Sequence, residues 1–274
     1  SGEAYWLMNP KNTFNDNVAS GFCVNWAAGG QVGAEGYGIW LGFNGVGAAG
    51  DVRIPASAGA DPFYDSVLMN VNRTPLLSFV DNEVYGAGRK GYSPWSVGCR
   101  EGEFELDPPS TQSEVLRLKV WNMYESGIYA YHVTRCVYRN ITIINCDVGV
   151  TGTDYHQYLV SFVNPKIHSC RIGIESPEFC YDDFLIQGGD LGNQWNLKNA
   201  QQFNVSPTAG RFLPAKTMTA RGVLHHAASE YIAHFSYVYP DDFLANWVQV
   251  NEMRVYDHAL IKDIPCLVWM MKMT

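Results

Sequence analysis

The chain has 274 residues, of which 47% are hydrophobic, 14% aromatic and 17% charged, and its formal net charge is −8. This acidic balance disfavours a nucleic-acid partner, because such proteins present positive charge to phosphates. No run of about 18 apolar residues occurs, so the sequence predicts no membrane span in this chain. The aromatic-rich, charge-poor composition favours an all-β protein over a helical bundle. No cofactor is predicted.

The first forty residues are dense in Asn and Asp and end in an aromatic element. The stretch "YWLMNPKNTFNDNVASG" covers residues 5–21, and "GYGIW" covers 36–40. Glycine-rich stretches lie at 27–38 and 45–61. The chain opens abruptly at Ser1, as a processed chain or a piece of a longer protein would.

A pattern then recurs along the chain. "NITIINCDVGV" (140–150) and "NPKIHSCRIGI" (164–174) both place Asn first, Cys seventh and Gly tenth. Aligning the chain on this glycine adds two further repeats, with glycines 36, 22 and 24 residues apart. Three columns are apolar in every repeat: Tyr92, Ile128, Val150 and Ile174 after the glycine, Tyr85, Trp121, Ile143 and Ile167 six before it, and Val80, Leu116, Tyr138 and Phe162 eleven before it.

Repeats of 22 to 24 residues predict a right-handed parallel β-helix, in which equivalent positions of successive turns stack about 4.8 Å apart. A helical solenoid has longer repeats with a different periodicity. We expect Tyr85, Trp121, Ile143 and Ile167 to form one buried column. The sequence assigns residues 1–206 to the β-helix and 207–274 to a smaller β-rich C-terminal unit. The alternative is an ordinary sandwich in which the repeat is a coincidence.

The opening stretch resembles the β-helix region of the cell-migration-inducing hyaluronan-binding protein, its transmembrane relative and fibrocystin. The matching residues are Trp6, Asn9, Pro10, Asn12, Asn17, Ala19, Gly21, Gly38 and Trp40. The resemblance covers roughly residues 4–180 as a pattern of turns, and the glycine-rich stretches depart from it. It implies an extracellular or cell-surface, glycan-associated β-helix. Some members are linked to hyaluronan depolymerisation and others have no accepted activity, so the resemblance does not decide between an enzyme and a scaffold.

The leading functional prediction is a non-catalytic, glycan-facing or structural module of a larger cell-surface or secreted assembly, with a glycan or other surface-protein chains as partners. One alternative is a hyaluronan-like polysaccharide depolymerase. His132, Asp154 and Glu178 lie five residues after successive glycines, and a hydrolase or lyase needs such carboxylates or a base. An ordinary solvated face would carry the same residues. A second alternative is a filament or adhesin subunit that self-assembles through open ends.

Tryptophans beside Gly-rich or Asn-rich loops are the candidates for sugar stacking: Trp40, Trp95 and Trp195. Each of them also suits a core position. Three N-x-[ST] sequons predict glycosylation at Asn72, Asn140 and Asn204, and they favour a secreted protein.

None of the seven cysteines forms a CxxC pair, and the i, i+4, i+8 spacing of His226, Glu230 and His234 is too long for one ion, so no metal site is predicted. Cys146 and Cys170 occupy the same position of consecutive turns, which predicts that they stack. Whether they form a disulfide or a reduced pair stays open.

Overall fold

The protein is described here from a computed structural model. The structure describes residues 4–7, 9–21, 36–42, 51–55, 66–70, 74–86, 88–97, 112–152, 157–175, 184–198, 217–221, 223–225, 231–234, 252–256 and 259–260. Every regular element within these ranges is a β-strand. The described residues form no helix that is long and apolar enough to cross a membrane.

Three parallel sheets, A, B and C, make up the body of the molecule, and sheets A and B are joined into one 16-stranded sheet where Trp95 pairs with Tyr131 and Val97 with Val133. Sheet A contains β1 (Tyr5–Leu7), β4 (Tyr37–Gly42), β9 (Lys90–Val97), β12 (Ser126–Tyr129), β15 (Val148–Thr151), β18 (Ile172–Glu175), β21 (Trp195–Lys198) and β24 (Tyr231–His234). Sheet B contains β2 (Thr13–Asn15), β7 (Ser78–Val80), β10 (Ser113–Leu116), β13 (Tyr131–Arg139), β16 (Tyr158–Val163), β19 (Phe184–Gln187), β22 (Thr217–Arg221) and β25 (Glu252–Tyr256). Sheet C contains β3 (Val18–Ser20), β8 (Glu83–Tyr85), β11 (Lys119–Trp121), β14 (Thr142–Ile144), β17 (Lys166–His168), β20 (Asp190–Gly192), β23 (Leu224–His225) and β26 (Ala259–Leu260).

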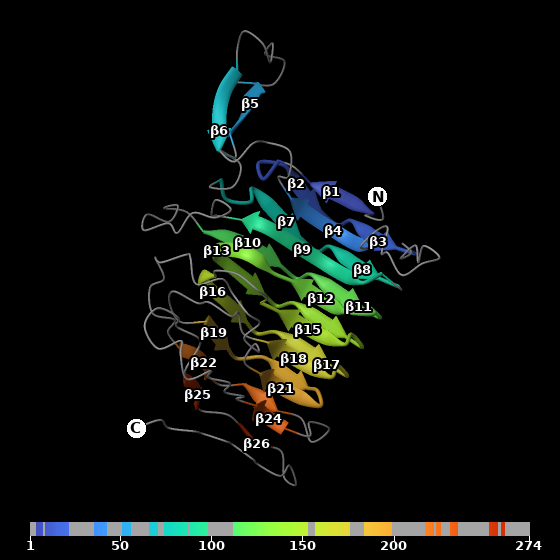
Figure 1. Ribbon diagram of the computed structural model, residues 1–274, viewed down its shortest axis with the longest axis vertical. Coiled ribbons are helices and arrows are strands. Elements are labelled where there is room, and N and C mark those ends of the chain that lie inside the picture. The colour runs from blue at the N-terminus through green and yellow to red at the C-terminus, as the bar shows by residue number, and fades with distance from the viewer. Residues whose placement is uncertain are drawn as a thin grey trace, which may run out of the picture.

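Each turn of the chain runs through sheets B, C and A in that order, and the next turn stacks on it (Figure 1). For example, β13, β14 and β15 pair in parallel with β16, β17 and β18. The predicted parallel β-helix is therefore confirmed. A separate antiparallel hairpin, β5 (Asp51–Pro55) and β6 (Ser66–Asn70), projects from the N-terminal end between the first two full turns (Figure 1).

Apolar columns from the three sheets meet inside the coil. Because equivalent positions stack, an inward position of each sheet must carry an apolar residue in every turn. The fully buried columns are Phe79, Val115, Tyr138, Phe162 and Ile186 in sheet B, Val84, Val120, Ile143, Ile167 and Leu191 in sheet C, and Tyr92, Ile128, Val150, Ile174 and Leu197 in sheet A.

The column after the glycine matches the prediction, but the two columns before it do not. Ile143 pairs with Ile167 as expected, whereas Trp121 pairs with Ile144 and Tyr85. The bend between β11 and β12 is one residue longer than the bend between β14 and β15. This extra residue shifts the alignment by one, and a one-residue shift moves a side chain to the opposite face of a strand. Tyr85 and Trp121 therefore lie on the outer face of sheet C.

The bends repeat a left-handed backbone conformation at equivalent positions. Between sheets B and C the non-glycine residues with positive φ are Asp16, Asp81, Arg117, Asn140 and Asn164, and between sheets C and A they are Asn122, Asn145 and Ser169. Asn and Asp tolerate this conformation better than other residues with a Cβ. The recurrence of Asn in the sequence therefore follows from the recurrence of the bends.

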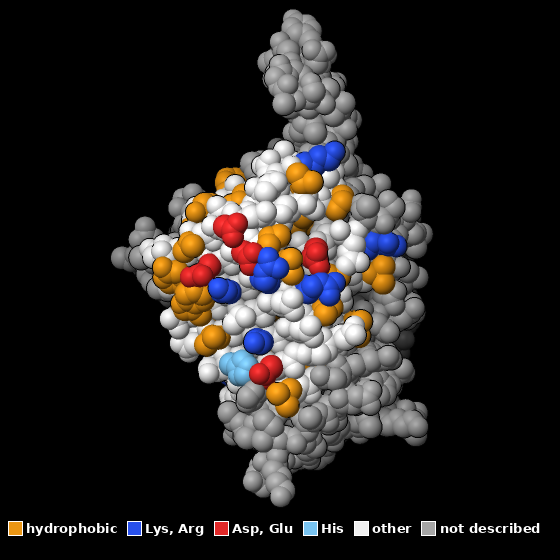
Figure 2. Space-filling model, turned by 180° about the vertical axis from the view of Figure 1, so that it is seen from behind, with side chains coloured by type: hydrophobic (Ala, Val, Ile, Leu, Met, Phe, Trp, Pro, Cys, Tyr) orange, Lys and Arg blue, Asp and Glu red, His pale blue; other side chains and the backbone are white. Residues whose placement is uncertain are grey.

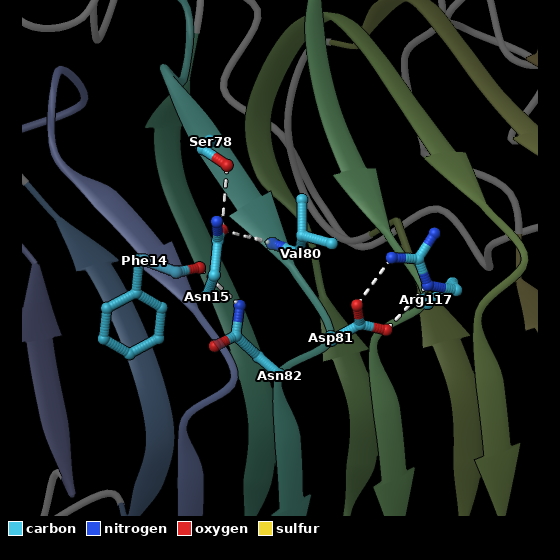
Figure 3. Close-up of polar contacts among 7 residues, drawn as sticks. All are labelled: Phe14, Asn15, Ser78, Val80, Asp81, Asn82 and Arg117. Atoms are coloured by element: carbon cyan, nitrogen blue, oxygen red, sulfur yellow. Dashed lines mark hydrogen bonds and ion pairs between the residues drawn. The ribbon is translucent and has the colours of Figure 1, made fainter.

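Polar side chains tie the first turns together (Figure 3). Ser78 Oγ and the Val80 N–H both donate to Asn15 Oδ1, at 2.8 and 3.0 Å. Asn82 Nδ2 donates to the Phe14 carbonyl at 2.7 Å. These bonds satisfy the polar groups involved. A buried donor or acceptor without a hydrogen-bond partner would cost about 1–3 kcal/mol of stability.

The described strands after residue 207 continue the same three sheets. Strands β22, β23 and β24 pair with β19, β20 and β21, and β25 and β26 follow them. The other residues of the predicted C-terminal unit lie outside the described part of the chain. The division at residue 207 stays a prediction.

Candidate functional site

The outer face of sheet A carries a stack of aromatic rings at its N-terminal end. Trp6 on β1 pairs in register with Trp40 on β4. Their ring centroids lie 5.1 Å apart with 12° between the planes. The Tyr37 ring stacks on Trp40 at 5.4 Å and 24°. Because Trp6 belongs to the first strand of the sheet, 48% of it remains exposed.

A lysine extends this stack across the next two strands. The Lys90 ammonium on β9 lies 3.6 Å from the centroid of the Tyr129 ring and 5.4 Å from that of Tyr37. Its charge is also balanced by Glu125, at 3.6 Å. Cation–π contacts of this kind stabilise a desolvated lysine by up to about 2 kcal/mol. We call Trp6, Trp40, Tyr37, Lys90 and Tyr129 the sheet A stack.

The three tryptophans predicted to bind glycan all lie on strands of sheet A. Trp40 is half-buried inside the sheet A stack. Trp95 lies on the neighbouring strand β9, in register with Gly42 of β4, and its side chain is outside the described set. Trp195 is half-buried on β21, and β12, β15 and β18 separate it from β9. The fold thus places Trp40 and Trp95 on neighbouring strands and Trp195 well away from them.

The predicted catalytic residues fall at the limits of the described structure. The backbone of His132 belongs to β13, but its side chain is not described. Asp154 and Glu178 lie outside the described residues. Their predicted grouping with His132 stays a prediction.

Sheet C carries a second ordered column on its outer face. The rings of Tyr85 and Trp121 stack at 4.8 Å with an angle of 1°. Ile144, 42% exposed, and His168 follow in the same column. His168 Nε2 lies 3.4 Å from Asp190 Oδ1 on the next turn. This column differs from the sheet A stack because both of its rings are flanked by further turns of the coil.

Charged side chains pair between neighbouring turns. Arg117 binds Asp81 through two bonds of 2.5 and 2.6 Å, and these bonds lower the pKa of Asp81. Arg139 and Glu114 form an ion pair at 2.7 Å. On the face drawn in Figure 2, acidic and basic side chains accordingly lie intermixed. The described side chains of this face therefore present no large field of one sign to a partner.

Of the three predicted glycosylation sites, Asn140 is within the described structure. It lies in the bend between β13 and β14 with φ of 53°, and its side chain is exposed. An amide in this position is accessible to modification. Asn72 and Asn204 lie outside the described residues.

Cys146 and Cys170 are buried, free thiols in the bends that join sheets C and A. Each follows a strand whose end residues pair, Ile144 with His168. The hydrogen bond between the two thiols raises the pKa of Cys146, and burial raises it further. The same bond lowers the pKa of Cys170. The pair contains no disulfide bond.

Of the sheet A stack, only Trp40 is a glycan-binding candidate from the sequence, and the other four members escape prediction: Trp6, Tyr37, Lys90 and Tyr129. Trp6 belongs to the family-like opening stretch, but nothing in its spacing from Trp40 shows that the two rings stack. Lys90 directly precedes Gly91, in a column where the later repeats have Ser126, Val148 and Ile172. A lysine in a column that otherwise holds small or apolar residues is the sequence signal that marks Lys90 as unusual.

Comparison with protein-family models, curated proteins and solved structures finds no match for this chain. The resemblance of the opening stretch to the hyaluronan-binding protein family stays a prediction. Within the described ranges, no group of three or more His, Cys, Asp or Glu side chains could hold a metal ion.

Proposed function

We propose that the chain is a glycan-facing β-helix module of an extracellular or cell-surface assembly, and that it binds glycan without cleaving it. The observation that carries this proposal is the sheet A stack, which ends in a half-exposed indole held in a fixed orientation by Trp40. Aromatic faces bind the apolar faces of pyranose rings, and a ring that is already fixed loses little conformational entropy on binding.

The geometry of sheet A also suits an extended chain of sugars. Its strands lie side by side at about 4.8 Å, so equivalent outer positions repeat along the coil axis with a short, regular spacing. Tyr129 and Trp40 lie on the same face as Trp6, two strands apart from each other. Because Tyr37, Ser93 and Lys90 are buried, a linear saccharide lying along the axis would contact the exposed Trp6 first. The half-buried Trp40 and Tyr129 are the next rings in its path.

The test is a panel of neutral, uronate-containing and sulfated oligosaccharides incubated with the full chain. We expect binding by calorimetry and no change in saccharide size by mass spectrometry. Shortened products would support the depolymerase alternative, in which His132, Asp154 and Glu178 act. Absence of binding across the panel, with sedimentation showing concentration-dependent end-to-end association, would support the filament alternative.

A further inference from the structure

The charged side chains of sheet A are bound to one another across neighbouring turns. Among the described residues, every Lys and Arg on the strands of this sheet and in the bends that lead into it from sheet C contacts a carboxylate. The pairs are Arg89 and Lys90 with Glu125, at 2.6 and 3.6 Å, Arg171 with Asp147, at 2.7 Å, and Lys198 with Glu175, at 3.3 Å. This part of the sheet therefore offers a ligand no unpaired cation.

Two of these pairs use both oxygens of their carboxylate. Arg171 donates through Nε and Nη2 to the two oxygens of Asp147, each at 2.7 Å. Glu175 accepts from Thr151 Oγ1 at 3.1 Å and from Lys198 Nζ at 3.3 Å. A carboxylate on a ligand would have to displace one that the fold already holds in place, and the ligand alone would lose freedom of motion in doing so.

The remaining positive charge of this set is enclosed by protein. Lys90 shares Glu125 with Arg89, but only 5% of Lys90 is exposed. Its ammonium lies 3.6 Å from the centroid of the Tyr129 ring, which balances its charge without a ligand. The whole chain carries a formal net charge of −8, and a field of this sign opposes the approach of a polyanion.

The part of the sheet A stack that a ligand can reach carries no charge. Trp6 is 48% exposed, and the half-buried Trp40 and Tyr129 are the other rings along the path of a saccharide. Such rings contact the apolar C–H faces of a sugar and attract no carboxylate or sulfate group. Binding through them depends on the area that is covered rather than on ionic strength.

We propose that the glycan bound at the sheet A stack is a neutral polysaccharide, one without uronate or sulfate groups. This inference rests on the proposed function, and it names the class of saccharide that the same face takes. A neutral sugar supplies the apolar ring face that Trp6 requires and leaves the ion pairs of sheet A intact. An acidic sugar would bring charges that meet no unpaired cation among the described residues.

Paired polysaccharides that differ only in charge test the proposal. A mixed-linkage β-glucan, a galactomannan and a soluble starch are each compared with the derivative in which the primary hydroxyls are oxidised to carboxylates. Binding to the full chain is measured by thermophoresis in about 0.05 M and about 0.5 M sodium chloride. We expect a neutral polymer to bind with a Kd that changes less than about twofold between the two salt concentrations, and its oxidised derivative to bind at least roughly fivefold more weakly at low salt.

The outcomes separate this inference from the proposed function. Equal or tighter binding of an oxidised derivative, weakened by salt and by Trp6→Ala, would overturn the neutral class while sheet A remained the glycan-binding face. If no polymer of either series bound, the proposed function would fail and this inference with it. Salt-independent binding of the neutral polymer that Trp6→Ala weakens and Trp121→Ala leaves unchanged would support both.

Discussion

Burial decides the reactivity of the cysteine on sheet B. Cys136 is 1% exposed in the core. Burial raises the pKa of its thiol to about 12, although a hydrogen bond with Tyr138 opposes this shift. Since the thiolate is the reactive form, very little of Cys136 is nucleophilic near neutral pH.

We therefore predict that Cys136 is not alkylated in the native protein at about pH 8. Iodoacetamide labelling followed by peptide mass spectrometry measures this, and labelling in denaturant is the control. Rapid labelling of Cys136 in the folded chain would show that this part of sheet B opens or is wrongly assigned.

The ion pair between Asp81 and Arg117 gives a pH-dependent contribution to stability. The hydrogen bonds from Arg117 lower the pKa of Asp81 from its ordinary value of 3.8. A carboxyl group with a lower pKa in the folded state stabilises the fold above its unfolded pKa, and this contribution is lost as the pH falls through the folded pKa.

We expect Asp81→Asn to unfold at lower urea concentration than the wild type at about pH 7, and the difference to shrink below about pH 4. The effect is small because the pair is exposed to solvent. Urea denaturation at both pH values measures it, and repetition in about 1 M salt is the control, since salt screens exposed pairs. A difference that grows on acidification would contradict the assigned ion pair.

At the scale of elements, the recurring glycines of sheet A exist because there is no space for a side chain. A Cβ on Gly127 would lie 2.6 Å from Ile143 Cγ2 and 2.7 Å from the Gly149 carbonyl oxygen. The glycine lets sheet A approach the core column of sheet C, and Gly91 and Gly149 repeat the arrangement, whereas a Cβ on Gly173 would meet Asn193 Nδ2 and the Asn196 carbonyl oxygen. Gly21 is different, because its φ is 68° and nothing lies within 4 Å of a Cβ placed there.

Gly127→Ala should therefore lower the free energy of unfolding by about 1–3 kcal/mol through overpacking. Gly21→Ala, the comparison variant, should cost roughly 1–2 kcal/mol from the backbone conformation alone. Thermal and urea denaturation measure both. A crystal structure of Gly127→Ala should show sheet A displaced from Ile143, whereas an unchanged structure with unchanged stability would contradict the packing described here.

At the scale of the whole molecule, the sequence predicts the stacking of turns but not every register. The column at Tyr92, Ile128, Val150 and Ile174 follows directly, because each of these residues adjoins the glycine used for alignment and lies in the same strand. Tyr85 and Trp121 could not be placed on the correct face, because a bend of variable length separates them from that glycine. The parallel coil itself follows from the repeat because identical turns can stack only in register.

The sheet A stack depends on contacts across turns that no local pattern contains. Trp6 and Trp40 are 34 residues apart, and the intervening stretch includes the glycine-rich segment, whose length does not fit the repeat. The residue types are informative, since Trp40 is a candidate for sugar binding from the sequence. Their stacking could be seen only once β1 and β4 were known to pair.

The most direct test of the proposed function is a glycan titration that compares two aromatic stacks on different sheets. For a saccharide that the wild type binds, isothermal titration calorimetry is carried out with Trp6→Ala and with Trp121→Ala. Trp121 is the matched control, because it belongs to a similar ring stack on the outer face of sheet C. Removing an aromatic ring on which a nucleic-acid base stacks costs about 1–3 kcal/mol of binding free energy. We expect a loss of the same order for a ring that stacks on a sugar. We predict at least a roughly fivefold weaker Kd for Trp6→Ala and an unchanged Kd for Trp121→Ala. Equal affinities of Trp6→Ala and the wild type would contradict the assignment of sheet A as the glycan-binding face.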